Sequence, residues 1–461
     1  MEVLKSLFRT QSLRDLYQQE AQLVRCLNAT DLTLLGIGAI VGAGIFVLTG
    51  IAAATAAGPG VILSYALAGL ACTFCALAYA ELASSIGGCG SAYGYAFVGL
   101  GELVAWIVGW MLLLEYCVAS ATVAIGWSGY VNNALAAMGV ALPEALTNNL
   151  FEGGLVNLPA MAIIFFISLL LAMGARESVK VNRMIVIIKL TVIILFIIMA
   201  GAYFRPDENW RPFLPFGSIG VINGAALIFF AYIGFDAVST AAEETLRPER
   251  NLPIGIIASL AICTLLYMLV AGVLTGAVNY SELNVSSPIS YALLKLGYHW
   301  GSFIVAIGAI AGLTSTILVM QFGLSRVVLA MSRDGLFPAK LAELHPKTKA
   351  PTLIILSTGT LIALAAGFAP IHTVAQLTNI GTLTAFISVC VAVMVLRYKQ
   401  PDLPRPFKTP YSPFIPVLGI ILCLFLMFNL RVITWWGFLI WTVAGLIFYF
   451  SYSRKRSVLA P

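Results

Sequence analysis

Long apolar stretches, separated by short charged or glycine- and proline-containing segments, follow one another along almost the whole chain. A helix that crosses the hydrocarbon core of a bilayer needs about 20 apolar residues. Runs near this length occur at 32–56, 61–83, 102–130, 158–174, 184–203, 218–240, 254–278, 302–327, 351–368, 375–396, 413–429 and 433–452. The pattern predicts an all-α integral membrane protein with 12 transmembrane helices.

The basic residues predict how these spans are oriented. An even number of spans places both termini on one side of the membrane. If that side is the cytoplasm, 21 Lys and Arg residues fall in inner segments and 4 in outer loops, with Lys189 left inside a span. Cytoplasmic loops carry an excess of Lys and Arg. We therefore expect a multi-pass protein of the cell (cytoplasmic) membrane with both termini cytoplasmic.

Two of the runs are interrupted in a way that indicates broken helices. Four glycines lie within the nine residues from Gly36 to Gly44, and each glycine inside a helix costs about 1 kcal/mol relative to alanine. The sixth run contains Gly234 and Asp236 two residues apart. Interrupted segments at corresponding positions of two halves are typical of inverted-repeat transporters with the binding site at the breaks. The alternative is close helix packing through small residues, which does not explain the second interruption.

This reading divides the chain into a five-plus-five inverted repeat, with helices 1 and 6 broken, and flanking parts. The expected parts are a cytoplasmic amphipathic N-terminal segment at 1–30, a first repeat (spans 1–5) at 31–203, a second repeat (spans 6–10) at 218–396, spans 11–12 at 413–452, and a cytoplasmic tail at 453–461.

The backbone of a broken helix can bind a zwitterion. The second half begins with free N–H groups and the first half ends with free carbonyls, and both need partners inside a membrane. We expect amides at the first break to bind a carboxylate and carbonyls at both breaks to bind an ammonium group, with glycine permitting close approach. The expected substrate contacts are Ile40, Gly42, Ala43, Gly44, Ile45, Phe230, Ala231 and Ile233.

Ionisable residues inside spans are candidates for function. Lys189 lies deep in the fifth run, where a buried ammonium is costly unless it is paired, so it is expected to bind and release a proton. The alternative is snorkelling to the membrane surface. Glu115, in the third run, is a second proton-coupling candidate or a structural partner of a broken-helix amide. Asp236 is expected to support the site by capping the second half of span 6.

The third and eighth runs supply the remaining candidate positions. Ser315 and Thr316 either face the first break or bond back to their own helix. Met320 lies four residues after Thr316, on the same face, where it either bounds a side-chain pocket, with Val118 and Phe230 as further wall residues, or packs against a neighbouring helix. The acidic pair at 243–244 is expected to be solvated, as a cap or gate.

Composition excludes several other classes of protein. Because 60% of the residues are hydrophobic and 10% are charged, against about a quarter charged in soluble domains, a water-soluble globular protein is excluded. The net charge of +6 is not gathered into a basic domain, so we expect no nucleic-acid partner. The His and Cys residues offer no catalytic pair or ligand set at one depth, so we expect no enzyme, metal or cofactor. A channel would need a continuous polar pore, whereas the polar residues in these spans are isolated, so a channel is not favoured.

Three stretches together resemble one known family: Asp31–Gly50, Phe229–Thr240 and Glu243–Pro253. They are similar to the amino acid-polyamine-organocation (APC) superfamily and, within it, to prokaryotic twelve-span members of the cationic amino acid transporter subfamily. The resemblance implies a five-plus-five inverted repeat, a substrate held between spans 1 and 6, and rocking of a bundle against a scaffold. It also implies that Lys189 replaces a sodium ion between spans 1 and 8, and hence proton coupling.

The expected function is therefore proton-coupled symport of an L-amino acid by alternating access, with the proton as coupling ion and lipid as the surrounding partner. Apolar candidate wall residues favour small neutral amino acids such as alanine. The alternatives are a transporter of arginine or lysine, which the subfamily implies, and a proton-independent exchanger. The sequence does not indicate whether an accessory membrane protein binds.

Overall fold

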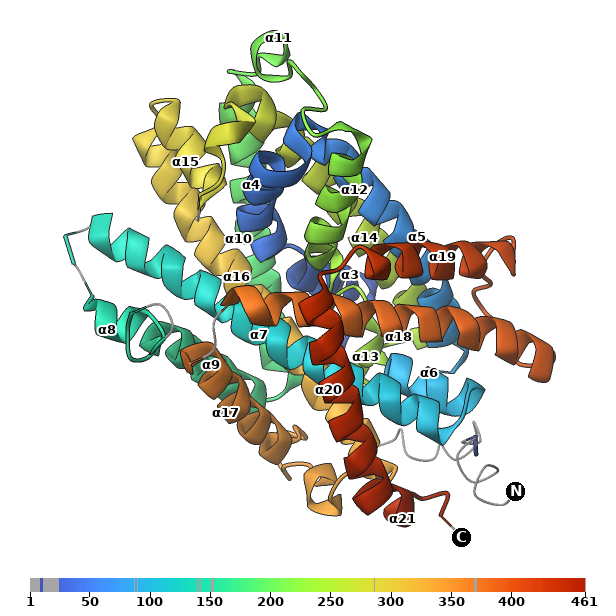
Figure 1. Ribbon diagram of the computed structural model, residues 1–461. Helices are drawn as coiled ribbons and strands as arrows, with labels where there is room; N and C mark the ends of the chain where they lie inside the picture. The colour runs from blue at the N-terminus through green and yellow to red at the C-terminus, as the bar shows by residue number, and fades with distance from the viewer. Residues whose placement is uncertain are drawn as a thin grey trace.

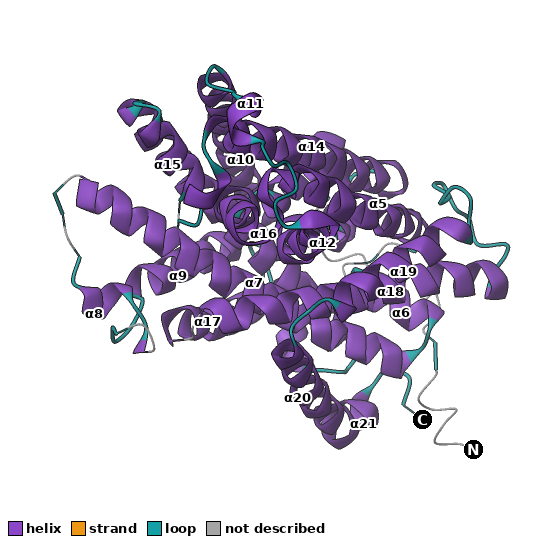
Figure 2. Ribbon diagram, turned by 45° about the horizontal axis from the view of Figure 1, so that its top comes forward, coloured by secondary structure: helices purple, strands orange, loops and turns teal. Residues whose placement is uncertain are grey.

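The computed structural model describes residues 9–10, 25–86, 88, 90–137, 139–140, 142–150, 153–285, 287–368 and 371–460. Within these ranges the chain consists of helices joined by loops, without a β-strand (Figure 2). Of the expected N-terminal segment at 1–30, residues 9–10 and 25–30 are described, and the last two of these belong to the first helix; the rest lies outside the described residues.

Two of the helices are broken, and the others are continuous. The first broken helix comprises α3 (Ala29–Ile40), η2 (Gly44–Leu48), α4 (Thr49–Ala52) and η3 (Ala53–Ala57), and the second comprises α12 (Gly217–Ile228), η6 (Phe229–Tyr232) and α13 (Ala237–Thr240). The other principal helices are α5 (Val61–Ser85), α6 (Ala92–Gly99), α7 (Glu102–Ala137), α9 (Leu158–Ala172), α10 (Ala175–Gly201), α14 (Pro248–Ala277), α15 (Pro288–Lys295), α16 (His299–Arg333), α17 (Thr352–Phe368), α18 (Ile371–Lys399), α19 (Phe414–Phe428) and α20 (Val432–Phe448).

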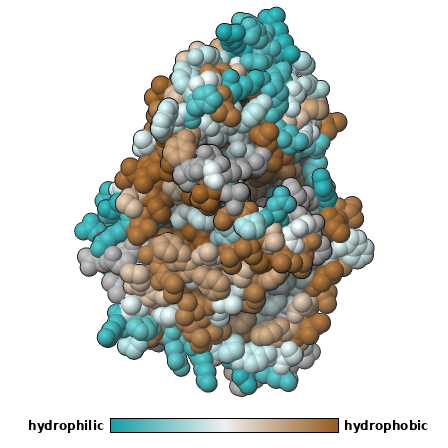
Figure 3. Space-filling view, turned by 90° about the vertical axis from the view of Figure 1, so that its left-hand side faces the viewer, coloured by the Kyte–Doolittle hydropathy of each residue, from teal (hydrophilic) through white to brown (hydrophobic). Residues whose placement is uncertain are grey.

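The molecule has the surface of a multi-pass membrane protein. In the described part of the chain, eight helices are long and apolar enough to cross a membrane, and four further apolar helices are shorter. Large apolar side chains are exposed along α9, α10, α14, α17 and α20. Figure 3 shows hydrophobic side chains in a broad middle band, with hydrophilic ones gathered at the two ends. Such a band matches the hydrocarbon layer of a bilayer.

Several helices extend beyond the apolar runs that predicted them. α10 begins at Ala175, nine residues before the run at 184, and includes Lys180 and Arg183. Lysine and arginine are good helix formers, and their long stems keep the charge near water while the backbone stays helical. At the centre of the molecule α7 and α16 cross and pack against each other, and α14 packs against α3 and α5 (Figure 1).

The C-terminal residues pack onto the helical body. The Ser457 hydroxyl donates to Glu102 at 2.8 Å, and the Tyr449 hydroxyl donates to the other oxygen of the same carboxylate at 2.9 Å. The amide of Val458 donates to the carbonyl of Asp334 at 3.0 Å. These bonds attach the described part of the segment 453–461 to the start of α7 and the end of α16.

Candidate functional site

The two broken helices touch each other at their breaks. Helix α3 ends at Ile40, and the chain is helical again from Ala43. In the second broken helix the turn between η6 and α13 has Gly234 at φ +122°, a conformation that favours glycine. A Cβ on Gly44 would lie 2.3 Å from the Cβ of Ala231 and 2.5 Å from its Cα. Both breaks therefore lie where the glycine pattern places them, and only glycine permits this approach.

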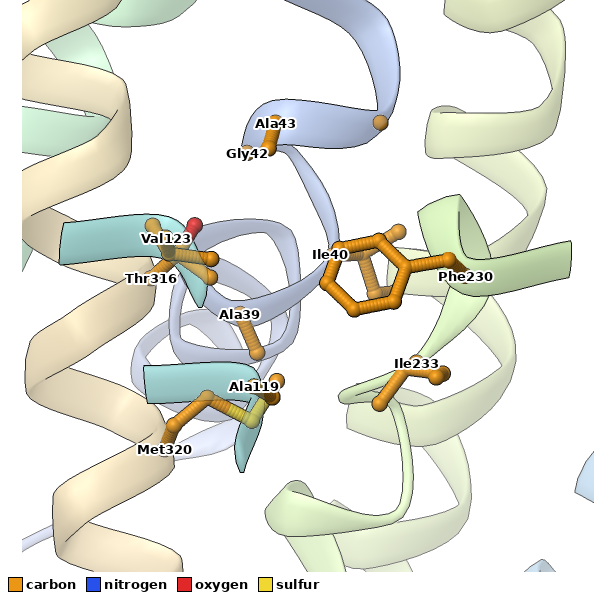
Figure 4. Close-up of a pocket in the computed structure, with 11 residues that line it drawn as sticks. Ala39, Ile40, Gly42, Ala43, Ala119, Val123, Phe230, Ile233, Thr316 and Met320 are labelled. Carbon is orange, nitrogen blue, oxygen red and sulfur yellow. The ribbon is translucent and has the colours of Figure 1, made fainter. Parts of the chain in front are cut away.

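A small cavity lies between the breaks and the two crossing helices. Its volume of about 10 Å³ is at the lower limit for one water molecule. It is lined by Ala39, Ile40, Gly42, Ala43, Gly44, Ala119, Val123, Phe230, Ile233, Thr316 and Met320 (Figure 4). None of these lining side chains is charged, and Thr316 contributes the one side-chain hydroxyl. A solute larger than water can enter only if the side chains move apart.

Most of the predicted contact residues come together at this cavity. Seven of the ten predicted substrate contacts line it, together with Thr316; Ile45, Ala231 and Val118 are buried nearby but do not line it. On α7 the lining residues are instead Ala119 and Val123, four residues apart on one face. Figure 4 shows Phe230 extending toward Ile40, and Met320 toward Ala119.

Two tyrosine hydroxyls that were not predicted from the sequence bind the carbonyls at the breaks. The Tyr267 hydroxyl lies 2.5 Å from the Ile40 carbonyl oxygen and 2.8 Å from that of Ala231. The Tyr65 hydroxyl lies 3.1 Å from the Gly44 carbonyl oxygen. A carbonyl oxygen has two lone pairs, so the carbonyls of Ile40 and Ala231 keep capacity for a second donor, whereas that of Gly44 also accepts from the Thr49 amide. A tyrosine inside an apolar run is the feature of the sequence that could have indicated this role, because a buried phenol hydroxyl needs a polar partner.

The Lys189 ammonium sits against the first break. Lys189 is fully buried on α10, and its Nζ lies 3.0 Å from the Gly38 carbonyl oxygen, 2.8 Å from that of Val41 and 2.7 Å from the Ser315 hydroxyl. These three acceptors match the three N–H bonds of an ammonium group. The side chain therefore points into the protein, and snorkelling does not describe it.

The α16 hydroxyls realise both of the geometries considered from the sequence. The Ser315 oxygen lies 3.1 Å from the Gly38 carbonyl oxygen and 2.9 Å from the Gly312 carbonyl oxygen in its own helix. The Thr316 oxygen lies 3.1 Å from the Gly38 carbonyl oxygen and 3.2 Å from that of Gly312. Lys189 and α16 together thus supply the partners that the end of α3 lacks.

The two buried acids have different surroundings. Asp236 accepts hydrogen bonds from the Tyr116 hydroxyl and, at 3.2 Å, from the Gly234 amide. It precedes α13, but its side chain does not cap that helix; it fixes the turn before the helix instead. Glu115 is fully buried, and neither of its carboxyl oxygens has a hydrogen-bond partner among the described residues. A bond to a broken-helix amide is therefore not what holds Glu115.

The acidic pair at 243–244 is buried, so the expectation that it is solvated is wrong. Glu244 is 2% exposed and pairs with Arg326 at 2.7 Å. Glu243 is 4% exposed and pairs with Arg333 at 2.9 Å. Both arginines lie on α16, seven residues and thus two turns apart. The partners are more than 80 residues away in sequence, so the local charge pattern alone suggested a solvated segment.

We expect Glu244→Gln to destabilise the protein strongly. Removing one partner of a buried ion pair costs about 3–5 kcal/mol because the other charge stays buried. The matched control is Glu282→Gln, since Glu282 pairs at the surface with Lys295, the last residue of α15, whose ammonium holds the pKa of Glu282 below its usual range. Exposed pairs contribute about 0–1 kcal/mol. Thermal unfolding of both purified variants tests this, and equal melting temperatures would contradict it.

A small uncharged cavity between two broken helices in a membrane protein is typical of a solute transporter. The chain belongs to the amino acid permease family, whose model matches residues 27–450.

The chain is 50% identical to the branched-chain amino acid permease BcaP of Bacillus subtilis, over 98% of this chain and 99% of that protein. It is 47% identical to the methylthioribose transporter of Bacillus subtilis, over 99% and 100%. It is 38% identical to the vacuolar cationic amino acid transporter 4 of Arabidopsis thaliana, over 83% of this chain and 64% of that protein. The relatives are transporters rather than enzymes, and the chain is an APC-superfamily amino acid permease.

Proposed function

We propose that the protein is a proton-coupled symporter that takes up neutral L-amino acids by alternating access. The observation that carries this proposal is the uncharged cavity at the two breaks, with a buried lysine bound to the carbonyls of the first break. Small neutral amino acids such as alanine fit the cavity with the least displacement of side chains.

The breaks supply partners for both charges of an amino acid. The helix that resumes at Ala43 begins with amides that lack intrahelical partners, and a helix N-terminus attracts an anion. We assign the carboxylate to the amides of Ala43, Gly44 and Ile45. The ammonium group is assigned to the carbonyls of Ile40 and of the segment 230–233, which approach the same cavity.

The cavity walls favour an uncharged substrate side chain. Met320 is 1% exposed, and with Phe230 and Ile233 it presents an apolar surface. A buried ammonium or guanidinium without a partner is costly. The names of two of the relatives reported above refer to branched-chain amino acids, whose side chains are uncharged, and to methylthioribose, which carries no charge. Transport of arginine or lysine remains the second candidate, favoured by the similarity to cationic amino acid transporters.

We expect Met320→Ser to admit larger or cationic amino acids while small neutral ones are still transported. Serine removes bulk from the wall and adds a hydrogen-bonding group, so it lowers both the steric and the desolvation cost of a long polar side chain. Competition of unlabelled arginine against labelled alanine measures the change, with Met331→Ser, which alters a methionine away from the cavity on the same helix, as control. An unchanged substrate profile would show that Met320 only packs against its neighbours.

Lys189 is the proposed coupling group because its protonation state sets how many hydrogen bonds it donates to the first break. A protonated amine donates three hydrogen bonds, to Gly38, Val41 and Ser315, and a neutral amine donates at most two. Loss of the proton therefore loosens the contact between α10, α16 and the end of α3. Glu115 is the second candidate. An exchanger that moves amino acids without protons would not need Lys189 to titrate.

The order of helix lengths supports the proposed inverted repeat. Each proposed half starts with a broken helix and continues with a long helix (25 and 30 residues) and a short one (8 and 8). A helix of 36 or 35 residues follows, then one of 15 or 17, then one of 27 or 29. We propose on this basis the halves 31–203 and 218–396, twelve spans in the cell membrane, and cytoplasmic termini.

Uptake of a labelled amino-acid panel into proteoliposomes tests the substrate assignment. We expect saturable uptake of alanine and of larger neutral amino acids, and little uptake of arginine or lysine. Uptake restricted to the cationic pair would overturn the assignment and favour the second candidate.

A further inference from the structure

A second cavity lies one helical turn from the first along the second broken helix. Its volume is about 390 Å³, and it opens between η3, α12, α18 and the loop that joins α19 to α20. Ala226 lines this cavity, and Phe230, four residues later, lines the cavity at the breaks. The two spaces are therefore consecutive along one chain segment, and the larger one is open to solvent.

The lining of this second cavity is polar and carries one charge. Its polar side chains are those of Thr55, Asn223, Asn379, Asn429 and Arg431. Arg431 is exposed, and none of the salt bridges among the described residues includes it. No acidic residue is among those that line the cavity. A guanidinium group has five N–H donors in a planar fork that matches a carboxylate.

The asparagines add acceptors near the same space. Asn379 is 5% exposed, and its Oδ1 has no hydrogen-bond partner among the described residues. Its Nδ2 lies 3.5 Å from the carbonyl oxygen of Ala226. Asn429 donates through Nδ2 to the Phe425 carbonyl at 2.7 Å, which leaves its carboxamide oxygen as an acceptor. An unpartnered, nearly buried carboxamide oxygen is costly unless a donor reaches it.

We propose that this cavity is a second, low-affinity binding site for the amino-acid zwitterion, which occupies it before it enters the cavity at the breaks. The carboxylate binds the Arg431 guanidinium, and the ammonium group donates to the carboxamide oxygens of Asn379 and Asn429. The proposal rests on the proposed function, because it takes the transported solute to be an amino acid.

Long-range attraction does not explain an effect of Arg431 on such a solute. Steering by a protein's field acts on the net charge of a ligand, and a zwitterion has none. An influence of Arg431 on the uptake of neutral amino acids therefore requires direct contact with the carboxylate. Alaninamide, in which an amide replaces the carboxylate, carries a net charge of +1, so the loss of the Arg431 cation should not raise its KM.

Steady-state uptake by Arg431→Gln in proteoliposomes tests the site. We expect the KM for alanine to rise about tenfold, the typical effect of losing a hydrogen bond to a charged group, with kcat unchanged because the step at the breaks is intact. Asn379→Leu, which keeps the side-chain volume, should raise the KM in the same direction. Arg205→Gln is the control, since Arg205 is exposed and its salt bridge is to nearby Glu208, which is also exposed.

The outcomes separate this proposal from the proposed function. A KM for Arg431→Gln equal to that of the wild type, with normal wild-type uptake, would overturn the second site and leave the transport function standing. An equal rise for alanine and alaninamide would also overturn it, because the carboxylate would not be the group recognised. Absence of amino-acid uptake by the wild type would instead refute the proposed function itself.

Discussion

Lys189→Met is expected to abolish accumulation of amino acid driven by a pH gradient. In a one-to-one symporter each pH unit supplies about 1.4 kcal/mol, which corresponds to a tenfold concentration ratio. Methionine keeps the approximate length of the side chain but cannot carry the proton or donate to the Gly38 and Val41 carbonyls. We therefore expect a ratio near one for the variant, measured with labelled alanine in proteoliposomes.

Two further lysine variants sharpen this experiment. Lys189→Arg keeps the charge but cannot release a proton, so it should also fail to accumulate substrate even where binding survives. Lys180→Met changes an exposed lysine on the same helix and should accumulate like the wild type. Normal accumulation by Lys189→Met would assign coupling to another group, with Glu115 the first to test.

Gly44→Val is expected to abolish substrate binding while the protein still reaches the membrane. A Cβ at this position is predicted to obstruct the backbone that binds the carboxylate. The structure adds a second reason, because the Cβ would lie 2.3 Å from the Cβ of Ala231. Because part of that contact is backbone, the two breaks must move apart. Binding is measured as substrate-induced thermal stabilisation, which for the wild type is about 2.7 kcal/mol at a concentration of 100 Kd.

The control for this variant is a glycine-to-alanine change elsewhere in a helix. A Cβ on Gly126 of α7 meets no atom within 4 Å. Gly126→Ala should therefore preserve binding and gain up to about 1 kcal/mol of helix stability. Saturable uptake by Gly44→Val at the wild-type rate would remove the substrate site from the first break.

The positions of the breaks were readable from the sequence, because the signal there is local. Closely spaced glycines weaken a helix wherever they stand, and Gly234 and Asp236 mark a turn inside an otherwise apolar run. The depth of Lys189 was equally local, since an ammonium in the middle of a span must find acceptors. Its actual acceptors, Val41 among them, depend on how three helices meet.

The remaining features depend on distant partners or on the rotation of a helix. The run that contains α7 has apolar residues all around the helix, with Glu115 and scattered hydroxyl residues among them. This pattern does not show which apolar residues point inward, and Val118 was predicted where Ala119 and Val123 line the cavity. Glu243 and Glu244 resemble a solvated pair until α16 brings Arg326 and Arg333 against them. Such pairings follow from tertiary packing, which hydropathy along the chain does not encode.

The central claim is that the amino acid bound at the two breaks moves together with a proton. Its most direct test is uptake of labelled alanine into proteoliposomes of the wild-type protein, with and without an imposed pH gradient and with the membrane potential clamped at zero. We expect transient accumulation of about tenfold per pH unit when the outside is acidic, and equilibration only when the gradient is absent. Uptake of equal size under both conditions, without accumulation, would contradict it, and uptake only into vesicles preloaded with unlabelled alanine would identify an exchanger.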